Sequence, residues 1–400
     1  MYKNRRQLLT YGAALSAAMT ALPASADTRK ATGYLITRWE KDEFALGSYS
    51  NMAKGATPAD RVALAAPVKD TLFFAGEATH SDFPSTVHGA LMSGRAAAKK
   101  IKRTDHQNIG IIGAGFSGLG AAKVLSNAGK KVTVIEGRNR LGGRVNTDKS
   151  LGVPVDLGAS WIHGVRGNPL TKLADEMDIK RSVTNYNSAK ILGERGWNWF
   201  NLPDWSEEVE VRQSFAEDSD KLSPAAFTEG EDMRGNDVLF EQGYAALLPA
   251  FNGDYKVRLE ESVQSIDWSE QQIAVKTSKQ TDQFDAVLVT VPLGVLKAGK
   301  IRFTPVLPKK KSEAIKRLGV GVLDKLYLRF DEVFWDKSAE WLMYVTEEPN
   351  GFPSWLNLYK HFQVPILMAF AGGSNARMRA AKTDEQILSE AHAALAAMYP

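Results

Sequence analysis

The sequence predicts an α/β protein organised around a nucleotide-binding βαβ unit at residues 109–136, and three observations support this fold class. The apolar, β-branched run Ile109–Ile112 is typical of a strand buried on both faces. A glycine-rich turn and an Ala/Leu-rich helix follow directly. A second strand, Lys131–Ile135, ends at Glu136, where a carboxylate can accept the hydroxyls of an adenosine ribose.

The glycine-rich turn carries the chemistry of this unit. Gly113, Gly115 and Gly118 have the spacing at which one glycine makes the tight turn, one admits a pyrophosphate and one lets helix and strand pack closely. The N-terminus of the following helix offers unpaired N–H groups and a positive dipole to phosphates. The combination predicts dinucleotide binding.

Two further motifs indicate which dinucleotide. Residues 136–144 read Glu-Gly-Arg-Asn-Arg-Leu-Gly-Gly-Arg, and residues 156–164 read Asp-Leu-Gly-Ala-Ser-Trp-Ile-His-Gly. Here the chain resembles the flavin-containing amine oxidases, which carry E-A-R-x-R-x-G-G-R and D-x-G-A-x-W in this order; Gly137 replaces the usual alanine. The residues alone also allow a solvated basic loop. The resemblance implies FAD, with further cofactor contacts at Arg138, Gly143, Arg144, Gly158, Ala159, Ser160, Trp161 and Val263.

The first 26 residues look like an export signal. Lys3, Arg5 and Arg6 precede an apolar run, and Ala24-Ser-Ala26 offers a cleavage site of small residues. The pair of arginines resembles a twin-arginine signal, with an ordinary secretory signal as the alternative. We therefore expect an exported, periplasmic protein with no stable membrane insertion after cleavage.

Composition narrows the remaining functions. The formal charge of +4 falls to +1 when the three cations of the signal are removed, so the sequence suggests no nucleic acid partner. The chain has no cysteine, which leaves neither disulfides nor a cysteine-linked flavin, and FAD is expected to bind noncovalently. Its six histidines show no metal-ligand spacing, and we expect no metal.

Residues 34–102 stand in an unexpected place. The strand-like run Tyr34–Trp39 and the stretch Phe73-Phe-Ala-Gly-Glu77 resemble the last part of an amine oxidase, yet here they come first. We interpret this order as a circular permutation. By the resemblance, Glu77 lies near the ribityl and pyrophosphate groups or orients Arg144, and Thr86 and Val87 lie beside the flavin ring. Without it, Glu77 reads as a solvated charge at the end of a strand.

The resemblance also suggests the residues that meet the substrate. Phe44 and Tyr49 occupy positions expected to form an aromatic cage, whose ring faces attract an amine; core packing is the alternative. Lys325 matches the family's catalytic lysine, which reaches the flavin through a water. Without the resemblance, the alternation of apolar and polar residues would place Lys325 on the solvent-exposed face of a strand. His163 is either a substrate contact or a structural histidine.

The expected architecture is a Rossmann-like FAD-binding domain of the p-hydroxybenzoate-hydroxylase-like type, interleaved with a substrate domain of sheet plus helices. The FAD domain is predicted from residues 67–102, 107–168 and 240–297, and the substrate domain from residues 27–66, 169–239 and 298–400. Residues 169–235 look helical, and the acidic stretch 204–232 is either a solvated face or an entrance for cations. Trp197, Trp199, Phe200 and Trp205 are expected to anchor this segment or to line the cavity.

The implied reaction is oxidation of a small-molecule amine by FAD and dioxygen, with hydrogen peroxide as product and polyamines as the favoured substrates. A monoamine or L-amino-acid oxidase on the same fold is one alternative. A noncatalytic FAD-binding protein is the other.

Overall fold

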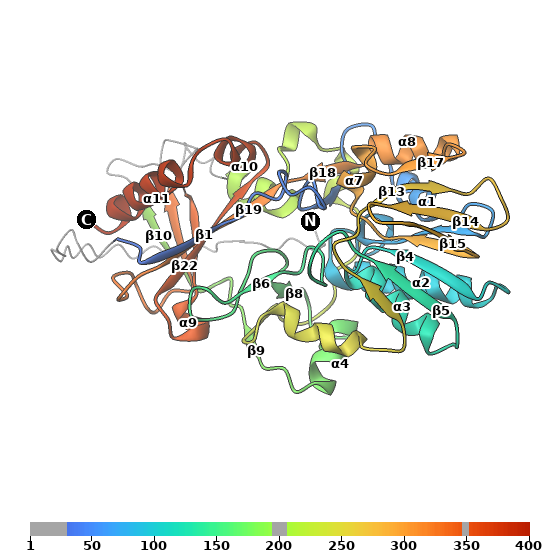
Figure 1. Ribbon diagram of the computed structural model, residues 1–400. Helices are drawn as coiled ribbons and strands as arrows, with labels where there is room; N and C mark the ends of the chain where they lie inside the picture. Colours follow the sequence, from blue (N-terminus) through green and yellow to red (C-terminus); the bar gives the residue numbers. More distant parts are fainter. Residues whose placement is uncertain (1–29, 194–205, 346–351) are drawn as a thin grey trace.

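The computed structural model describes residues 30–193, 206–345 and 352–400. The expected signal at residues 1–26 lies outside the described residues. So do the four aromatic residues Trp197, Trp199, Phe200 and Trp205. Two main sheets lie side by side along the molecule, each with its own helices (Figure 1). The fold is α/β, as predicted.

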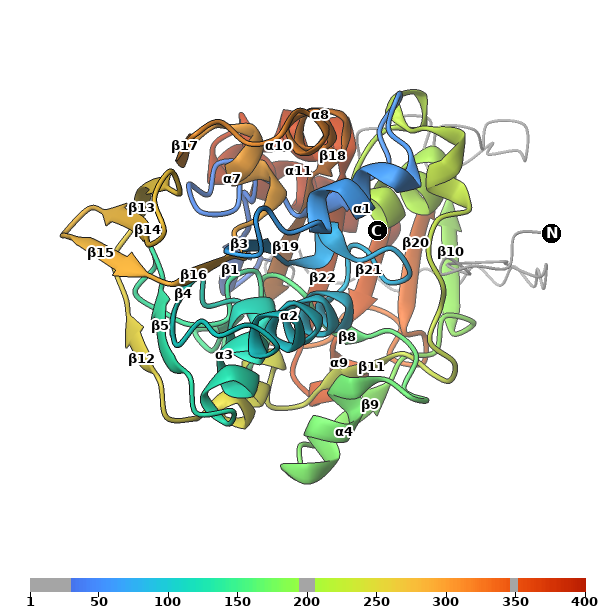
Figure 2. The same cartoon turned by 90° about the vertical axis from the view of Figure 1, so that its right-hand side faces the viewer.

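The first main sheet is wholly parallel. Its order is β12 (Lys256–Arg258), β5 (Lys131–Ile135), β4 (Asn108–Ile112), β16 (Ala286–Val289) and β3 (Leu72–Phe74). Helices α2 (Val87–Lys102) and α3 (Phe116–Ser126) pack against each other beside it (Figure 2). A four-stranded sheet of β15 (Thr281–Phe284), β14 (Ile273–Thr277), β13 (Val263–Asp267) and β17 (Arg302–Thr304) covers the other face.

Strand β4 is buried on both faces, as its sequence predicts. Ile109 and Ile111 pack with the helical cluster around Leu119, whereas Ile112 packs with Ile273 and Val275 of the four-stranded sheet. Successive side chains of a strand point to opposite faces, so one apolar run serves two cores.

The second main sheet has six strands, in the order β1 (Gly33–Ile36), β19 (Leu323–Arg329), β22 (Ile366–Gly372), β21 (Ser354–Asn357), β20 (Trp341–Val345) and β10 (Ala189–Gly193). Leu326 and Leu328 pack with residues of α11 (Asp384–Met398). Thr383 opens that helix, because its hydroxyl accepts the N–H of Gln386 while the Gln386 side chain accepts the N–H of Thr383. The opposite face of β19 is also buried: Tyr327 is 1% exposed and Lys325 is 5% exposed. The alternative of a solvated strand face is therefore wrong.

Residues 169–239 are less helical than expected. After α4 (Pro169–Glu176) the chain forms β9 (Arg181–Val183) and β10. β9 pairs with β11 (Val238–Phe240), and β10 extends the six-stranded sheet beside β20. Long-range pairing with strands remote in sequence thus decides the structure of this segment. The helical turns that follow are Glu207–Arg212, Gln213–Phe215, Ser219–Lys221 and Pro224–Phe227.

The remaining elements are short and lie in both halves of the molecule. They are β2 (Tyr49–Asn51), α1 (Pro58–Ala65), the 3-10 turn Glu77–Thr79, β6 (Thr147–Asp148), β7 (Val155–Asp156), β8 (Trp161–Ile162), the 3-10 helix Tyr244–Phe251, α7 (Leu293–Lys297), α8 (Lys309–Arg317), β18 (Gly319–Gly321), α9 (Tyr359–Phe362) and α10 (Gly373–Ala380). Within the described ranges, no helix has the length and apolarity needed to cross a membrane.

The N-terminal part of the described chain contributes to both main sheets. β1 pairs antiparallel with β19, and β3 forms an edge of the parallel sheet. Arg103–Gln107 then links α2 directly to β4, as the short connector requires. The N–H of Ala31 donates to His392 Nε2 at 3.1 Å, and Ala31 packs in the same apolar cluster as Tyr399. The two ends of the described chain therefore meet at one edge. The permutation and the exact domain boundaries stay predictions.

Candidate active site

One cavity of about 1140 Å³ runs between the two main sheets. It extends from the glycine turn after β4 and the carboxylate of Glu136 to Lys325 and the aromatic side chains of the six-stranded sheet. Pockets for small molecules typically measure about 300–1,000 Å³. The cavity therefore has room for a large dinucleotide and a second, smaller molecule.

The glycine turn is packed too closely for side chains at two of its positions, and at Gly115 it is open. Gly113 has φ +105°, a conformation that favours glycine, and a Cβ on Gly118 would lie 2.0 Å from the carbonyl oxygen of Gly113. Gly115 caps α3 and lines the cavity together with Phe116 and Ser117. The N-terminus of an eleven-residue helix thus borders the cavity, which is the arrangement that binds diphosphates.

Glu136 is 6% exposed at the end of β5. Its Oε2 accepts the N–H of Ala114 at 2.7 Å, and its Oε1 accepts the N–H of Arg138 at 2.9 Å. Each carboxylate oxygen has a further lone pair, so the group can also accept ribose hydroxyls. Val263 also lines the cavity.

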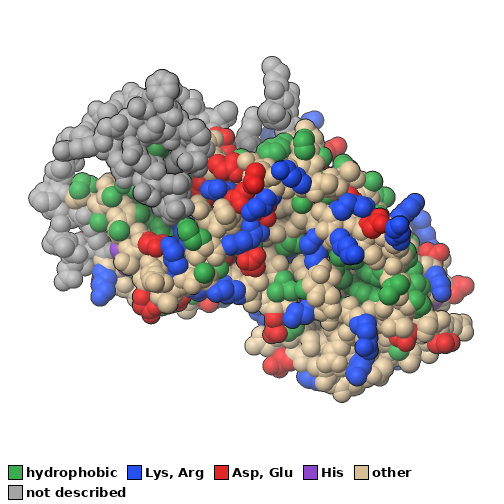
Figure 3. All heavy atoms as spheres, turned by 90° about the horizontal axis from the view of Figure 1, so that it is seen from above, with side chains coloured by type: hydrophobic (Ala, Val, Ile, Leu, Met, Phe, Trp, Pro, Cys, Tyr) green, Lys and Arg blue, Asp and Glu red, His purple; other side chains and the backbone are tan. Residues whose placement is uncertain are grey.

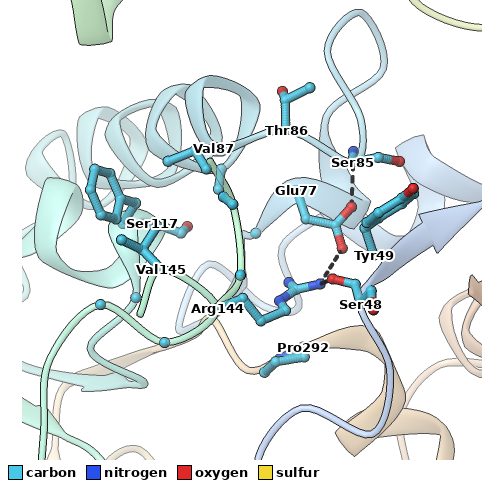
Figure 4. Close-up of a pocket in the computed structure, with 18 of the residues that line it drawn as sticks. Ser48, Tyr49, Glu77, Ser85, Thr86, Val87, Ser117, Arg144, Val145 and Pro292 are labelled. Carbon is cyan, nitrogen blue, oxygen red and sulfur yellow. Dashed lines mark hydrogen bonds and ion pairs between the residues drawn. The ribbon is translucent and has the colours of Figure 1, made fainter. Parts of the chain in front are cut away.

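Glu77 and Arg144 form an ion pair in the cavity wall (Figure 4). Arg144 Nη1 lies 3.0 Å from Glu77 Oε1, and the N–H of Ser85 donates to Glu77 Oε2 at 2.9 Å. The hydroxyl of Ser50 donates to the same oxygen at 2.7 Å. Burial favours the protonated form of Glu77, but the charge of Arg144 and the hydrogen bond from Ser50 lower its pKa below the ordinary value. The alternative of a solvated carboxylate is wrong, and Glu77 holds Arg144 in place.

Thr86 and Val87 line the cavity at the start of α2 (Figure 4). The hydroxyl of Thr86 caps this helix by accepting the N–H of Gly89 at 3.1 Å. A Cβ on Gly89 would lie 1.8 Å from the carbonyl oxygen of Phe83, so the chain before the helix packs closely on its first turn. This packing fixes Thr86 and Val87 at the cavity wall.

Lys325 projects from β19 toward the turn at residues 156–160. Its Nζ donates to the carbonyl oxygens of Asp156 at 2.8 Å and Gly158 at 2.6 Å, and lies 2.6 Å from Ser160 Oγ. Burial lowers the pKa of Lys325, and the buried carboxylate of Asp156 partly offsets this effect. Lys325 therefore lines the cavity, and it also holds the turn that contains Ala159 and Trp161.

An aromatic wall lies beside Lys325. Lys325 Nζ is 5.9 Å from the ring centroid of Trp161 and 6.0 Å from that of Phe370. The Phe370 ring also stacks against Trp341, with centroids 6.4 Å apart and planes inclined by 26°. All three rings line the cavity. Trp341 and Phe370 were missed in the sequence because both lie in strands whose neighbours are apolar and equally buried.

His163 lies at the cavity with an acidic partner. Its Nδ1 is 2.7 Å from Asp237 Oδ2, and that carboxylate also accepts the N–H of Gly164 at 2.8 Å and the hydroxyl of Tyr186 at 3.0 Å. All four residues line the cavity. Asp237 and Tyr186 gave no signal in the sequence, because residues 163, 186 and 237 meet only in three dimensions.

The structure separates the two rings of the expected cage. Tyr49 donates its hydroxyl to the carbonyl oxygen of Gln213 at 3.0 Å and lies beside Glu77 (Figure 4). Phe44 instead packs on Gly137, directly after Glu136: a Cβ on that glycine would lie 2.4 Å from Phe44 Cε1. Phe44 thus lies at the Glu136 end of the cavity and away from Tyr49, which contradicts its predicted place in a cage with Tyr49.

Arg138 is also used differently from the expectation. Its guanidinium binds both carboxylate oxygens of Asp42, at 2.7 Å and 2.5 Å, and it borders a hollow next to the main cavity. Its phosphate contact stays a prediction. Gly143, Gly158, Ala159, Ser160 and Trp161 all line the main cavity. In the part of the chain that the structure describes, no three His, Cys, Asp or Glu side chains are grouped to hold a metal ion.

Comparison with known proteins decides the family. The model of the flavin containing amine oxidoreductases matches residues 12–102, 116–210 and 187–400. The chain belongs to this family. Flavin-containing amine oxidoreductases similar in sequence include polyamine oxidase 4 of Oryza sativa subsp. japonica, 31% identical over 354 residues and covering 72% of each chain. Protein FLOWERING LOCUS D of Arabidopsis thaliana is 31% identical over 362 residues, covering 72% of this chain and 45% of its own length.

Solved structures show the same fold. A putrescine oxidase bound to putrescine gives a TM-score of 0.55 at 17% identity, covering 73% of this chain and 81% of its own. Cyclohexylamine oxidase from Brevibacterium oxydans gives a TM-score of 0.55 at 18% identity, covering 74% and 81%. The family implies a flavin cofactor. The open glycine turn, the helix N-terminus and the buried Glu136 fit such a group.

Proposed function

We propose that this amine oxidoreductase oxidises small aliphatic amines, polyamines in particular, with noncovalently bound FAD. One observation carries the proposal: a single cavity joins the dinucleotide features around Gly113 and Glu136 to the aromatic wall and the buried amine of Lys325. The polyamine oxidases among its relatives support the substrate class. The absence of cysteine supports noncovalent binding.

The residues of the chain have separate tasks in this proposal. The glycine turn and the α3 N-terminus bind the diphosphate, and Glu136 binds the adenosine ribose. Arg144, held by Glu77, contributes a fixed positive charge beside the flavin. The aromatic wall excludes water and attracts the amine. A flavin held by these residues would supply the hydride acceptor for the amine α-carbon and would be reoxidised by dioxygen to give hydrogen peroxide, while water would hydrolyse the imine.

Lys325 is the catalytic residue we propose, because it lines the cavity beside the aromatic wall and its pKa is lowered by burial. A lysine amino group at the cavity wall can also bind a water. His163, oriented by Asp237, is the proposed contact for a second polar group of the substrate. Tyr49 and Trp161 are the proposed aromatic contacts.

Two measurements test the proposal. Purified protein should be yellow, and acid precipitation should release intact FAD; flavin that stays with the polypeptide would overturn noncovalent binding. Peroxide formation is then measured with putrescine, spermidine, spermine, tyramine and amino acids. The highest kcat/KM should be found among the polyamines. Preference for tyramine or an amino acid supports the alternative oxidases, and a flavin-loaded protein without turnover supports a noncatalytic flavoprotein.

Partner and location belong to the same proposal. On the described part of the face in Figure 3, acidic and basic side chains are interspersed, which does not favour nucleic acid as a partner. The signal proposed for residues 1–26 supports export to the periplasm by the twin-arginine route. Replacement of Arg5 and Arg6 by lysine should leave the protein in the cytoplasm, as measured by cell fractionation.

We also propose that the family's last segment stands first in this chain. The pairing of β1 with β19 and the contact of Ala31 with His392 support this order, since the ends of the described chain could be joined without moving either sheet. A variant that starts at Asp105 and carries residues 30–102 after Pro400 should bind flavin and oxidise amines. A soluble variant without flavin would count against the permutation.

A further inference from the structure

Two side chains from remote parts of the sequence meet at the adenosine end of the cavity. Asp42 lies in the turn after β1, and Arg138 lies in the loop after β5, so their ion pair joins the two halves of the molecule. Arg138 Nη1 donates to Asp42 Oδ2 at 2.7 Å, and Nη2 donates to Oδ1 at 2.5 Å. Such bidentate pairs are stronger and more directional than single contacts.

The pair is partly shielded from solvent. The side chain of Arg138 is 12% exposed and that of Asp42 is 25% exposed. The N–H of Arg138 donates to Glu136 Oε1, and the N–H of Phe44 donates to Asp42 Oδ1 at 3.0 Å. The ion pair is therefore connected at one side to the proposed ribose-binding carboxylate and at the other to Phe44.

Phe44 completes the contact between the two segments. Its ring centroid lies 5.5 Å from the guanidinium carbon of Arg138, within the range of a cation–π interaction. The ring also occupies the space that a side chain at position 137 would take, since a Cβ there would lie 2.4 to 2.9 Å from three of its atoms. Gly137 is thus required for Phe44 to pack on the backbone beside Glu136.

The location gives this contact a function. Phe44 and Gly137 border the main cavity, and together with Asp42 and Arg138 they border the adjoining hollow of about 570 Å³. Glu43 and Phe44 thus line the main cavity next to Gly137, and Asp42 lines the adjoining hollow.

We propose that Asp42, Phe44 and Arg138 form a latch over the adenosine end of the flavin site, and that the latch slows the release of FAD. The inference rests on the proposed binding of FAD. The new element is that these three side chains retain the cofactor and take no part in amine binding or in the reaction. Gly137 has the supporting role of leaving room for the Phe44 ring.

The rate of flavin release tests the latch. Wild-type holoenzyme and the variants Asp42→Asn and Phe44→Ala are diluted, and the recovery of flavin fluorescence gives the release rate. Each variant should release FAD at least tenfold faster. FMN, which lacks the adenosine, should leave the variants and the wild type at equal rates. Asp384→Asn is the control, because it removes a carboxylate from a comparably exposed arginine pair, with Arg38, that lies outside the cavity.

A second comparison isolates the role of Gly137. Gly137→Ala should speed FAD release as much as Phe44→Ala does, because the methyl group displaces the ring. The double variant should release FAD no faster than Phe44→Ala alone. If the accelerations of FAD release by Gly137→Ala and Phe44→Ala multiply in the double variant, the two residues act independently, and the proposed role of Gly137 is wrong.

The remaining outcomes also decide the proposal. Equal FAD release from the wild type, Asp42→Asn and Phe44→Ala overturns the latch while FAD binding stands. Slower release from Asp42→Asn also overturns it, because Arg138 then binds the phosphates once its partner is removed. Equal acceleration of FMN and FAD indicates general loosening of the structure and rejects a specific latch. A wild-type protein that binds no FAD rejects the proposed function itself.

Discussion

Replacement of Glu77 by glutamine tests the buried charge that supports the flavin site. The carboxylate is 5% exposed and accepts hydrogen bonds from Ser50, Ser85 and Arg144. Glutamine has the same size but only one acceptor oxygen, and its amide group would face donors. Because the side chain of Arg144 is 23% exposed, its charge stays partly solvated, and the main cost is that of buried hydrogen-bonding groups left unpaired, about 1–3 kcal/mol of unfolding free energy. At about 2 °C per kcal/mol, Tm should fall by roughly 2–6 °C.

The effect should depend on pH in a defined direction. The pKa of Glu77 is lowered in the folded protein, so its contribution to stability is complete above the ordinary glutamate pKa and is lost as the pH falls through the folded value. The difference in Tm between wild type and variant should therefore shrink in acid.

Differential scanning calorimetry between pH 3 and pH 8 measures this difference, with Glu313→Gln as the matched control. Glu313 forms only exposed ion pairs on α8, whose removal should change the unfolding free energy by less than about 1 kcal/mol. If Glu77→Gln lowers Tm no more than Glu313→Gln does, the reasoning about the buried carboxylate is refuted.

Three other changes should be measurable. Lys325→Met should keep its flavin but slow turnover at least tenfold, equivalent to a barrier about 1.4 kcal/mol higher, and full activity in stopped-flow reduction would contradict its catalytic role. Burial lowers the pKa of Lys311 to about 7, so the unfolded chain holds one more proton between about pH 7 and 10.5. Through this group, the free energy of unfolding measured in urea should rise over that window by up to about 1.4 kcal/mol per pH unit. Lys311→Met should remove this rise, whereas Lys309→Met, a control at an exposed lysine, should retain it. Asp237→Asn should raise KM for a diamine severalfold with little change in kcat, because His163 loses its orienting carboxylate; an unchanged KM would exclude that role.

Local sequence determined the nucleotide-binding unit. The run Ile109–Ile112, the glycine turn and Glu136 occupy the predicted strand, turn and strand end, because the pattern that identifies them spans fewer than about 30 residues and its two strands pair directly with each other. The capping box at Thr383 was predictable for the same reason, since its hydrogen bonds join residues three apart. The resemblance in the motifs extended this local prediction to the family.

Tertiary structure decided what local patterns leave open. The alternation of side chains along β19 places Lys325 on the face opposite Leu326 but does not say that this face is buried. The turn at residues 156–160 covers it. The resemblance placed Phe44 and Tyr49 in one aromatic cage, whereas the chain turns between them and places Phe44 on Gly137. Asp237 reaches His163 across 74 positions of sequence, a contact with no local signature. Burial and long-range charge pairing depend on which segments the fold brings together, so these parts of the site appear only once the two sheets are in place.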